Sequence, residues 1–188
     1  QYEKIKDTVN ASIQEVLDTT TYINGPLVHE FQKDLEAYLG VKHVIPCANG
    51  TNALQIAMMG LGLQPGDEVI TATFTYVATA EVIALLGLTP VLVDVDPDTF
   101  ALNLDQVREV LTPRTKAIVP VHLYGQGVAM EDLMALAATA GVHVVEDCAQ
   151  AHGARYKGRA VGSIGHVGAW SFCQDKIMTT GGEGGMVT

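Results

Sequence analysis

The sequence is poor in charged and aromatic residues. Charged residues make up 17% and aromatic residues 6% of its 188 positions, whereas 48% are hydrophobic. This balance suits a single α/β domain with a buried sheet, and the length allows a sizeable core. No apolar run approaches the roughly 20 residues of a membrane span, and the polar N-terminus does not resemble a signal peptide. We therefore expect no membrane partner.

Basic residues are also scarce. Eleven lysines and arginines face 21 aspartates and glutamates, which gives a formal net charge of −10. A phosphate backbone demands basic patches, so such an acidic chain is a poor candidate for binding nucleic acid. A phosphate group on a small ligand would instead need backbone amides, such as those at a helix N-terminus.

Cysteine is limited to Cys47, Cys148 and Cys173, each within or beside an apolar, strand-like run. An odd, scattered set argues against a disulfide framework. We expect free thiols, a reducing cytoplasm and simple core packing for all three.

Apolar strands alternate with helices along most of the chain, and no period repeats. Residues 1–40 read as a helical region, with helices at 3–18 and 28–39, and residues 41–188 as an α/β core. Strands are expected at 41–47, 68–71, 90–95, 116–121, 142–147 and 168–172, and helices near 48–62, 73–86, 104–111 and 130–140. This βαβ succession predicts a mainly parallel sheet with helices on both faces.

The stretch from Val142 to Lys176 contains the residues from which the candidate site is predicted. Asp147 ends an apolar strand, where open α/β sheets place their ligands, and Lys176 follows the next strand in a loop of small residues. Pyridoxal phosphate requires a lysine amine for a Schiff base and a carboxylate that keeps its ring nitrogen protonated. Gln150 could reach the ring hydroxyl and Ser171 the phosphate. Taken singly, Asp147 could be a turn or cap residue and Lys176 a surface group.

A turn of small residues, which includes Gly50 and Thr51, leads from a strand into a helix and aims free amides at one point. Gly50 would let a ligand approach the backbone, and Thr51 adds a hydroxyl. The alternative is a plain turn capped by Asn49. A dinucleotide-binding dehydrogenase is set aside, because residues 48–53 lack the Gly-x-Gly-x-x-Gly pattern.

Other polar residues favour structural roles. Asp94 and Asp96 fall on one side of a strand end, but the following Pro97 and Asp98 favour turn chemistry over a metal site. His122 follows a strand and so could line the site, but it is interpreted as a satisfied structural histidine. We predict no metal centre.

Several motifs together identify a family. The run 146–154 (Glu-Asp-Cys-Ala-Gln-Ala-His-Gly-Ala), the motifs at 162–165, 171–172 and 182–185, and Lys176 resemble the DegT/DnrJ/EryC1/StrS sugar aminotransferases. The resemblance implies the aspartate aminotransferase fold (fold type I), a three-layer αβα large domain with a mainly parallel sheet and one antiparallel strand near the chain's end. Family members are about twice as long, so it also implies an N-terminal portion without the C-terminal small domain.

The same resemblance implies a function. Such enzymes use pyridoxal 5'-phosphate to move an amino group, here from glutamate, to a nucleotide-diphosphate keto-sugar for surface glycans or antibiotic sugars. It implies that Gly50 and Thr51 hold the phosphate, that Tyr76 stacks on the ring, and that a homodimer shares its active sites. Core packing is the alternative for Tyr76 and the expectation for Phe74. The loop 178–185 favours amination at C4 over C3. The alternative is a non-catalytic regulatory relative or an inactive fragment.

Overall fold

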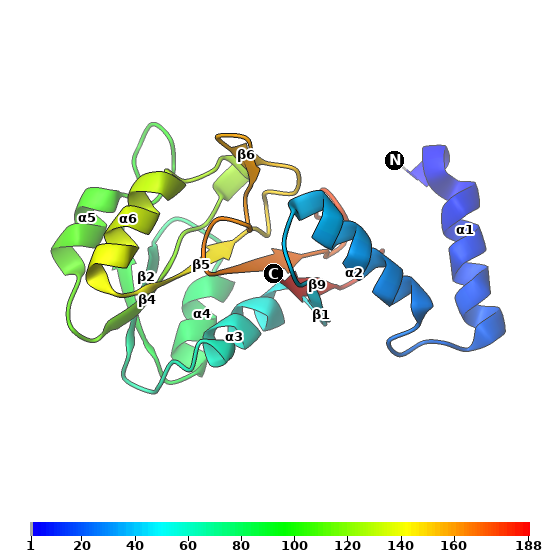
Figure 1. The fold of residues 1–188 in the computed structure, drawn as a ribbon, viewed down its shortest axis with the longest axis horizontal. Coiled ribbons are helices and arrows are strands. Elements are labelled where there is room, and N and C mark those ends of the chain that lie inside the picture. Colours follow the sequence, from blue (N-terminus) through cyan, green and yellow to red (C-terminus); the bar gives the residue numbers. More distant parts are fainter. Residues whose placement is uncertain (1) are drawn as a thin grey trace.

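A seven-stranded sheet forms the centre of the molecule (Figure 1). The structure is a computed structural model and describes residues 2–188. In spatial order the strands are β1 (Ile45–Cys47), β9 (Gly185–Val187), β8 (Val167–Ser171), β5 (His143–Asp147), β4 (Thr115–Val119), β2 (Glu68–Ala72) and β3 (Thr89–Val93). Neighbouring strands are parallel except at β9, which runs antiparallel to both β8 and β1. The predicted parallel sheet and its antiparallel strand are thus confirmed.

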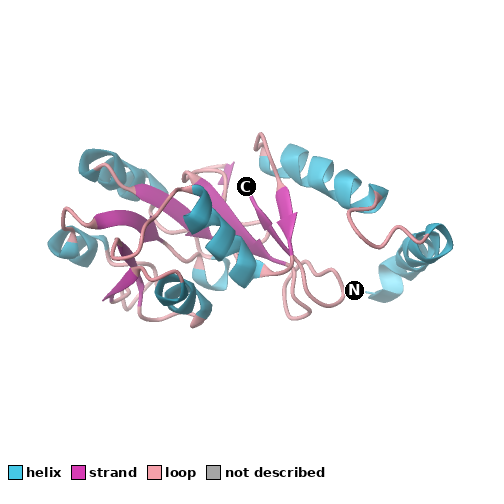
Figure 2. Ribbon diagram, turned by 90° about the horizontal axis from the view of Figure 1, so that it is seen from below, coloured by secondary structure: helices cyan, strands magenta, loops and turns pink. Residues whose placement is uncertain are grey.

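Helices cover both faces of this sheet, as the view in Figure 2 shows. On one face lie α3 (Gly50–Gly60) and α4 (Ala78–Leu85), and on the other lie α2 (Pro26–Leu39), α5 (Leu104–Val110) and α6 (Met130–Ala140). A short 3-10 turn, η1 (Leu123–Gly125), follows β4, and β6 (Arg155–Tyr156) pairs with β7 (Arg159–Ala160) in a separate ribbon. The result is a three-layer αβα arrangement.

Side-chain alternation along the strands supplies both cores. Val69 packs with the α3 and α4 side chains, whereas its neighbour Ile70 packs with those of α5 and α6. Val145 and Val144 divide in the same way. Because successive side chains of a strand point to opposite faces, a continuous apolar run can fill two cores at once.

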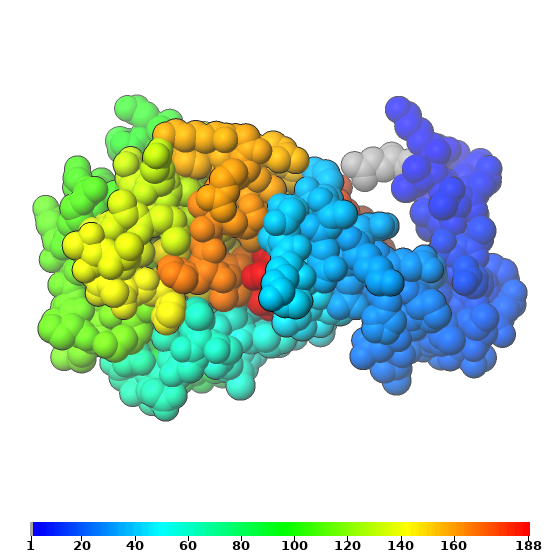
Figure 3. All heavy atoms as spheres, viewed as in Figure 1, coloured from blue at the N-terminus to red at the C-terminus, as the bar shows by residue number. Residues whose placement is uncertain are grey.

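The two helices predicted near the N-terminus are present as α1 (Tyr2–Thr19) and α2. Leu35 and Leu39 of α2 join Trp170 and Phe172 in a third apolar cluster. By contrast, α1 has no buried residue and lies away from the sheet (Figures 1 and 3). Across residues 2–188, no helix combines the length and apolar character needed to cross a membrane.

The structure corrects several element predictions. The strand expected to be buried at 90–95 is β3, a partly exposed edge strand, because it pairs only with β2. Within the stretch 41–47 only the last three residues form a strand. The helix predicted from residue 73 begins at Ala78, and the preceding loop leaves Phe74 48% exposed rather than in the core. The turn at Asp96 is confirmed, since its carboxylate accepts hydrogen bonds from the backbone amides of Asp98 and Thr99.

Candidate active site

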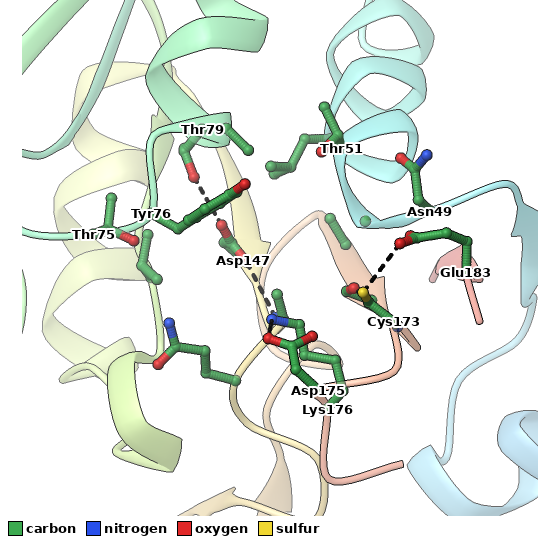
Figure 4. A pocket seen from close by; sticks show the side chains of 18 of the residues that line it. Asn49, Thr51, Thr75, Tyr76, Thr79, Asp147, Cys173, Asp175, Lys176 and Glu183 are labelled. Atoms are coloured by element: carbon green, nitrogen blue, oxygen red, sulfur yellow. Dashed lines mark hydrogen bonds and ion pairs between the residues drawn. The ribbon is translucent and has the colours of Figure 1, made fainter. Parts of the chain in front are cut away.

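A cavity of about 540 Å³ opens at the carboxyl ends of β5 and β8, beside the first turns of α3 and α4 (Figure 4). All seven residues predicted for the cofactor site line this cavity, namely Gly50, Thr51, Tyr76, Asp147, Gln150, Ser171 and Lys176. These residues come from four separate parts of the chain. The parallel topology brings them together, because it places the carboxyl ends of the strands at one edge of the sheet.

Asp147 lies at the inner wall of the cavity, at the end of β5. Its side chain is buried, accepts a hydrogen bond of 2.8 Å from the Thr79 hydroxyl, and accepts another of 3.1 Å from the Ala149 amide. Burial raises the pKa of this carboxyl above its ordinary value, although these hydrogen bonds and the nearby charge of Lys176 act in the opposite direction. A cation placed in the cavity would stabilise the ionised form of this buried carboxyl group.

Lys176 faces the same cavity from the loop that follows β8 (Figure 4). Its side chain is 21% exposed, and its Nζ lies 3.4 Å from a carboxylate oxygen of Asp175. A backbone hydrogen bond from Lys176 to the Cys173 carbonyl closes a turn that presents the side chain. The amine is therefore held at the cavity while remaining reachable from solvent.

The start of α3 forms another wall. The Asn49 side chain caps the helix by accepting a hydrogen bond of 2.8 Å from the Asn52 amide. The amides of Gly50 and Thr51 belong to the first turn, so they have no acceptor within the helix and suit an anion. A Cβ added at Gly50 would stand 2.6 Å from the Cβ of Ser171. Glycine is thus required here by the close approach of β8, a reason that the sequence did not reveal.

Tyr76 and Gln150 complete the predicted set. Tyr76 is 73% exposed and lines the cavity, so the alternative that it packs in the core is wrong. The Gln150 side-chain oxygen accepts a hydrogen bond of 3.1 Å from the Tyr124 amide. This contact ties the η1 turn to the rim of the cavity.

Thr79 and Cys173 also line the cavity, and the sequence reasoning did not predict either of them for the site. Thr79 holds Asp147, although 68 positions separate them. Cys173, predicted to pack in the core, instead lines the cavity, and its thiol donates a hydrogen bond of 3.1 Å to Glu183. That contact raises the pKa of the Cys173 thiol. Thr79 follows Tyr76 by three positions, so the two would share a face of the helix predicted from residue 73, which is the one signal that could have suggested Thr79.

On the opposite face of β5, Glu146 lies in a fully buried polar cluster with His122 and Cys148, whose potential metal-ligand atoms all lie within 4.8 Å of one another. His122 Nδ1 accepts a hydrogen bond from the Val128 amide, so its Nε2 carries the proton and donates to Glu146 at 2.9 Å. Both ring nitrogens are therefore already used. This arrangement confirms the prediction of a structural histidine.

The Glu146 carboxylate also accepts backbone hydrogen bonds from Gly162, Ile164 and Gly165, at 2.8, 2.8 and 2.6 Å. Burial alone would raise its pKa, but the hydrogen bond from His122 and those from the loop outweigh burial and lower it. Glu146 thus fixes the 162–165 loop against the sheet and remains ionised.

Known proteins similar to this chain include an aminotransferase, a regulatory protein and a solved aminotransferase structure. The chain is 49% identical to the UDP-2-acetamido-2-deoxy-3-oxo-D-glucuronate aminotransferase of Pseudomonas aeruginosa, covering 100% of this chain and 52% of that protein. It is 45% identical to a pleiotropic regulatory protein of Geobacillus stearothermophilus, with 100% and 50% coverage. A crystal structure of a DegT DnrJ EryC1 StrS aminotransferase from Brucella abortus superimposes with a TM-score of 0.97 at 43% identity, over 100% of this chain and 52% of that one.

The chain therefore spans about half the length of the curated relatives it matches. The sequence profile of the family described as the DegT/DnrJ/EryC1/StrS aminotransferases matches residues 3–188. Both the profile and the superposition extend across the sheet and the cavity. The chain belongs to the DegT/DnrJ/EryC1/StrS aminotransferase family.

Proposed function

We propose that this chain carries the cofactor-binding site of a pyridoxal phosphate-dependent aminotransferase that acts on a nucleotide-linked keto-sugar. The observation that carries the proposal is the presence of Lys176 and the buried Asp147 in one cavity. An amine and a carboxylate at the ends of adjacent parallel strands are the two groups that this cofactor requires. Residues 41–188 form the cofactor-binding core, and residues 1–40 a helical region beside it.

The residues present fit this cofactor. Lys176 would hold it covalently, and Asp147 would pair with its ring nitrogen. The first-turn amides of α3, together with Thr51 and Ser171, offer a phosphate site. The chain has a net charge of −10, so a general excess of basic residues does not supply one. The exposed ring of Tyr76 offers a stacking surface. When bound, pyridoxal phosphate supplies an electron sink for carbanion charge.

Each side chain then has a defined task. Asp147 holds a proton on the ring nitrogen, and the hydrogen bond from Thr79 fixes the orientation of its carboxylate. Lys176, once free, is the base that removes a proton from the amino donor and the acid that returns it. Its turn, closed by the Cys173 carbonyl, keeps the amine at the cavity for both tasks.

The remaining features of the reaction follow the family resemblance. Glutamate is the proposed donor and a nucleotide-diphosphate keto-sugar the acceptor, in a homodimer with shared sites. The loop 178–185 favours amination at C4, whereas the Pseudomonas aeruginosa relative is named for a 3-oxo sugar. Assays should therefore compare 3-keto and 4-keto nucleotide sugars. The three free thiols support a reducing compartment such as the cytoplasm.

A second candidate is a regulatory protein. It is favoured by the 45% identity to the pleiotropic regulatory protein of Geobacillus stearothermophilus. The two candidates differ in whether the bound cofactor is converted when an amino donor is added.

Borohydride trapping tests the proposal. The chain is incubated with pyridoxal phosphate, reduced and mapped by peptide mass spectrometry. We expect one phosphopyridoxyl adduct, at Lys176, that is lost in Lys176→Ala and retained in the matched control Lys116→Ala, which alters an exposed lysine on β4. Adducts scattered over surface lysines, or none, would exclude the catalytic function for this chain. Loss of the cofactor's absorbance band on adding glutamate would favour the enzyme over the regulator.

A further inference from the structure

Three exposed aromatic residues gather at the rim of the cavity. The Phe74 and Phe100 rings have centroids 5.7 Å apart, and the Phe100 and Tyr124 rings 6.3 Å apart. Their exposed fractions are 48%, 44% and 71%. They come from three loops that follow β2, β3 and β4, so they share the edge of the sheet at which the cavity opens. We call Phe74, Phe100 and Tyr124 the aromatic rim.

The aromatic rim is joined to the cavity at two points. Phe74 lies two positions before Tyr76, which lines the cavity. The Tyr124 amide donates its hydrogen bond to Gln150, which also lines the cavity. The rim is therefore attached to the wall of the cavity through Tyr76 and Gln150.

The backbone holds two of these rings in unusual conformations. Phe100 has φ 55° and Tyr124 has φ 56°, in the left-handed region that bulky side chains rarely adopt. The Phe100 turn is closed by its own amide bonding to the Asp96 carbonyl at 2.8 Å. Strain of this kind persists where surrounding contacts impose it, and it is concentrated at binding sites. In these conformations the Phe100 and Tyr124 side chains remain 44% and 71% exposed.

The charges of the three loops that carry the aromatic rim favour an uncharged ligand over a phosphate. The three loops, residues 73–77, 94–103 and 121–128, contain no lysine or arginine, and the second contains Asp94, Asp96 and Asp98. A phosphate placed against this rim would be repelled, whereas an uncharged planar ring would gain stacking and apolar contact. A nucleotide-linked sugar must bring its sugar to Lys176, so its base lies outside the innermost part of the cavity, and the aromatic rim is attached to residues that line this cavity.

We infer that the aromatic rim binds the nucleobase of the nucleotide-linked substrate by stacking. This inference rests on the proposed function, which supplies the substrate class. It assigns the base to a surface formed by three loops of one chain, and it assigns none of the diphosphate contacts to that surface.

Calorimetric titration tests the assignment. UDP, GDP, dTDP and inorganic pyrophosphate are titrated into the cofactor-loaded chain and into Phe100→Leu and Tyr124→Leu, which keep apolar bulk but lose the flat face. We expect roughly tenfold weaker binding of the nucleoside diphosphates in each leucine variant, unchanged binding in Tyr124→Phe, and no effect on pyrophosphate. Tyr2→Leu, a change at an exposed tyrosine on α1, is the matched control and should behave as the parent chain.

The outcomes separate the inference from the proposed function. Borohydride labelling of Lys176 without saturable nucleotide binding, or with equal binding in the leucine variants, would overturn the base site and leave the proposed function intact. Unlabelled Lys176 together with nucleotide binding that is weakened in the leucine variants would support the base site and overturn the proposed function. A leucine variant that changes only the sedimentation coefficient would show that the rim is a contact between two copies, which also overturns the inference.

Discussion

Glu146 and Asp147 are neighbours in the chain, yet their carboxylates point to opposite faces of β5. Asp147 faces α4 and the cavity, where Thr79 holds it, whereas Glu146 faces His122 and the 162–165 loop. The pKa of Asp147 is raised and that of Glu146 is lowered. The period of two along a strand thus gives two adjacent acids different roles, one at the candidate site and one in the fold.

Removing the Thr79 hydroxyl should weaken cofactor binding. Thr79→Val keeps the shape but leaves a buried carboxylate oxygen without its 2.8 Å donor, at a cost of about 1–3 kcal/mol in the free energy of unfolding. Asp147 loses a contact that favours its charged form, so affinity for pyridoxal phosphate should fall. Absorbance titration and urea unfolding measure the two effects. Thr139→Val, on the exposed face of α6, is the control, and equal behaviour of the two variants would contradict the role of Thr79.

Asp147→Asn should stabilise the cofactor-free chain at neutral pH while abolishing cofactor binding. Burial raises the folded pKa of Asp147, so the folded state keeps its proton to higher pH than the unfolded state. The stability of the parent chain therefore declines as pH rises from the unfolded pKa through the folded pKa. The asparagine variant lacks this decline. Denaturant unfolding across that interval measures it, and parallel profiles for the two proteins would refute the prediction.

Glu146→Gln should destabilise the fold by about 3 kcal/mol, because a buried, charged acceptor of four hydrogen bonds becomes a neutral amide that places a donor among donors. Thermal or urea unfolding at pH 7 measures the loss, with the exposed Glu109→Gln as control.

This loss should also depend on pH. Since the folded pKa of Glu146 is depressed, its stabilisation is fully present above the unfolded pKa and disappears as pH falls through the folded pKa. The parent and Glu146→Gln curves should therefore converge in acid. A constant difference between them down to the folded pKa would show that Glu146 does not contribute through its charge.

Gly50→Ala should cost about 1–3 kcal/mol, because the added methyl group would meet Ser171 and force β8 and α3 apart. Gly60→Ala is a matched control in the same helix. Nothing lies within 4 Å of its added Cβ, so it should stabilise the chain by about 0.5–1 kcal/mol. Urea unfolding compares the two, and Ser171→Gly should restore part of the loss in Gly50→Ala. Equal effects at both glycines would contradict the packing requirement.

Local sequence patterns and the family resemblance were sufficient to predict the order of the elements and seven of the residues that line the candidate site. Apolar strands alternating with helices are a local property, so the βαβ succession and the sheet's parallel character could be predicted. The positions of Asp147 and Lys176 at strand ends then placed them at one edge, and the motifs around them identified the family. The antiparallel strand β9 was predicted from the family resemblance alone, because a strand of three residues is too short to show a hydrophobic periodicity.

The contacts around that site, by contrast, could be identified only in the folded chain. Thr79 and Asp147 lie 68 positions apart, and no local pattern encodes their contact. Phe74 was expected in the core but is exposed, because the loop before α4 is longer than its composition suggests. Likewise, position 50 requires glycine because a side chain there would clash with Ser171, which lies on a strand far along the sequence. Contacts of this kind depend on how the elements pack, whereas the elements themselves depend on neighbouring residues.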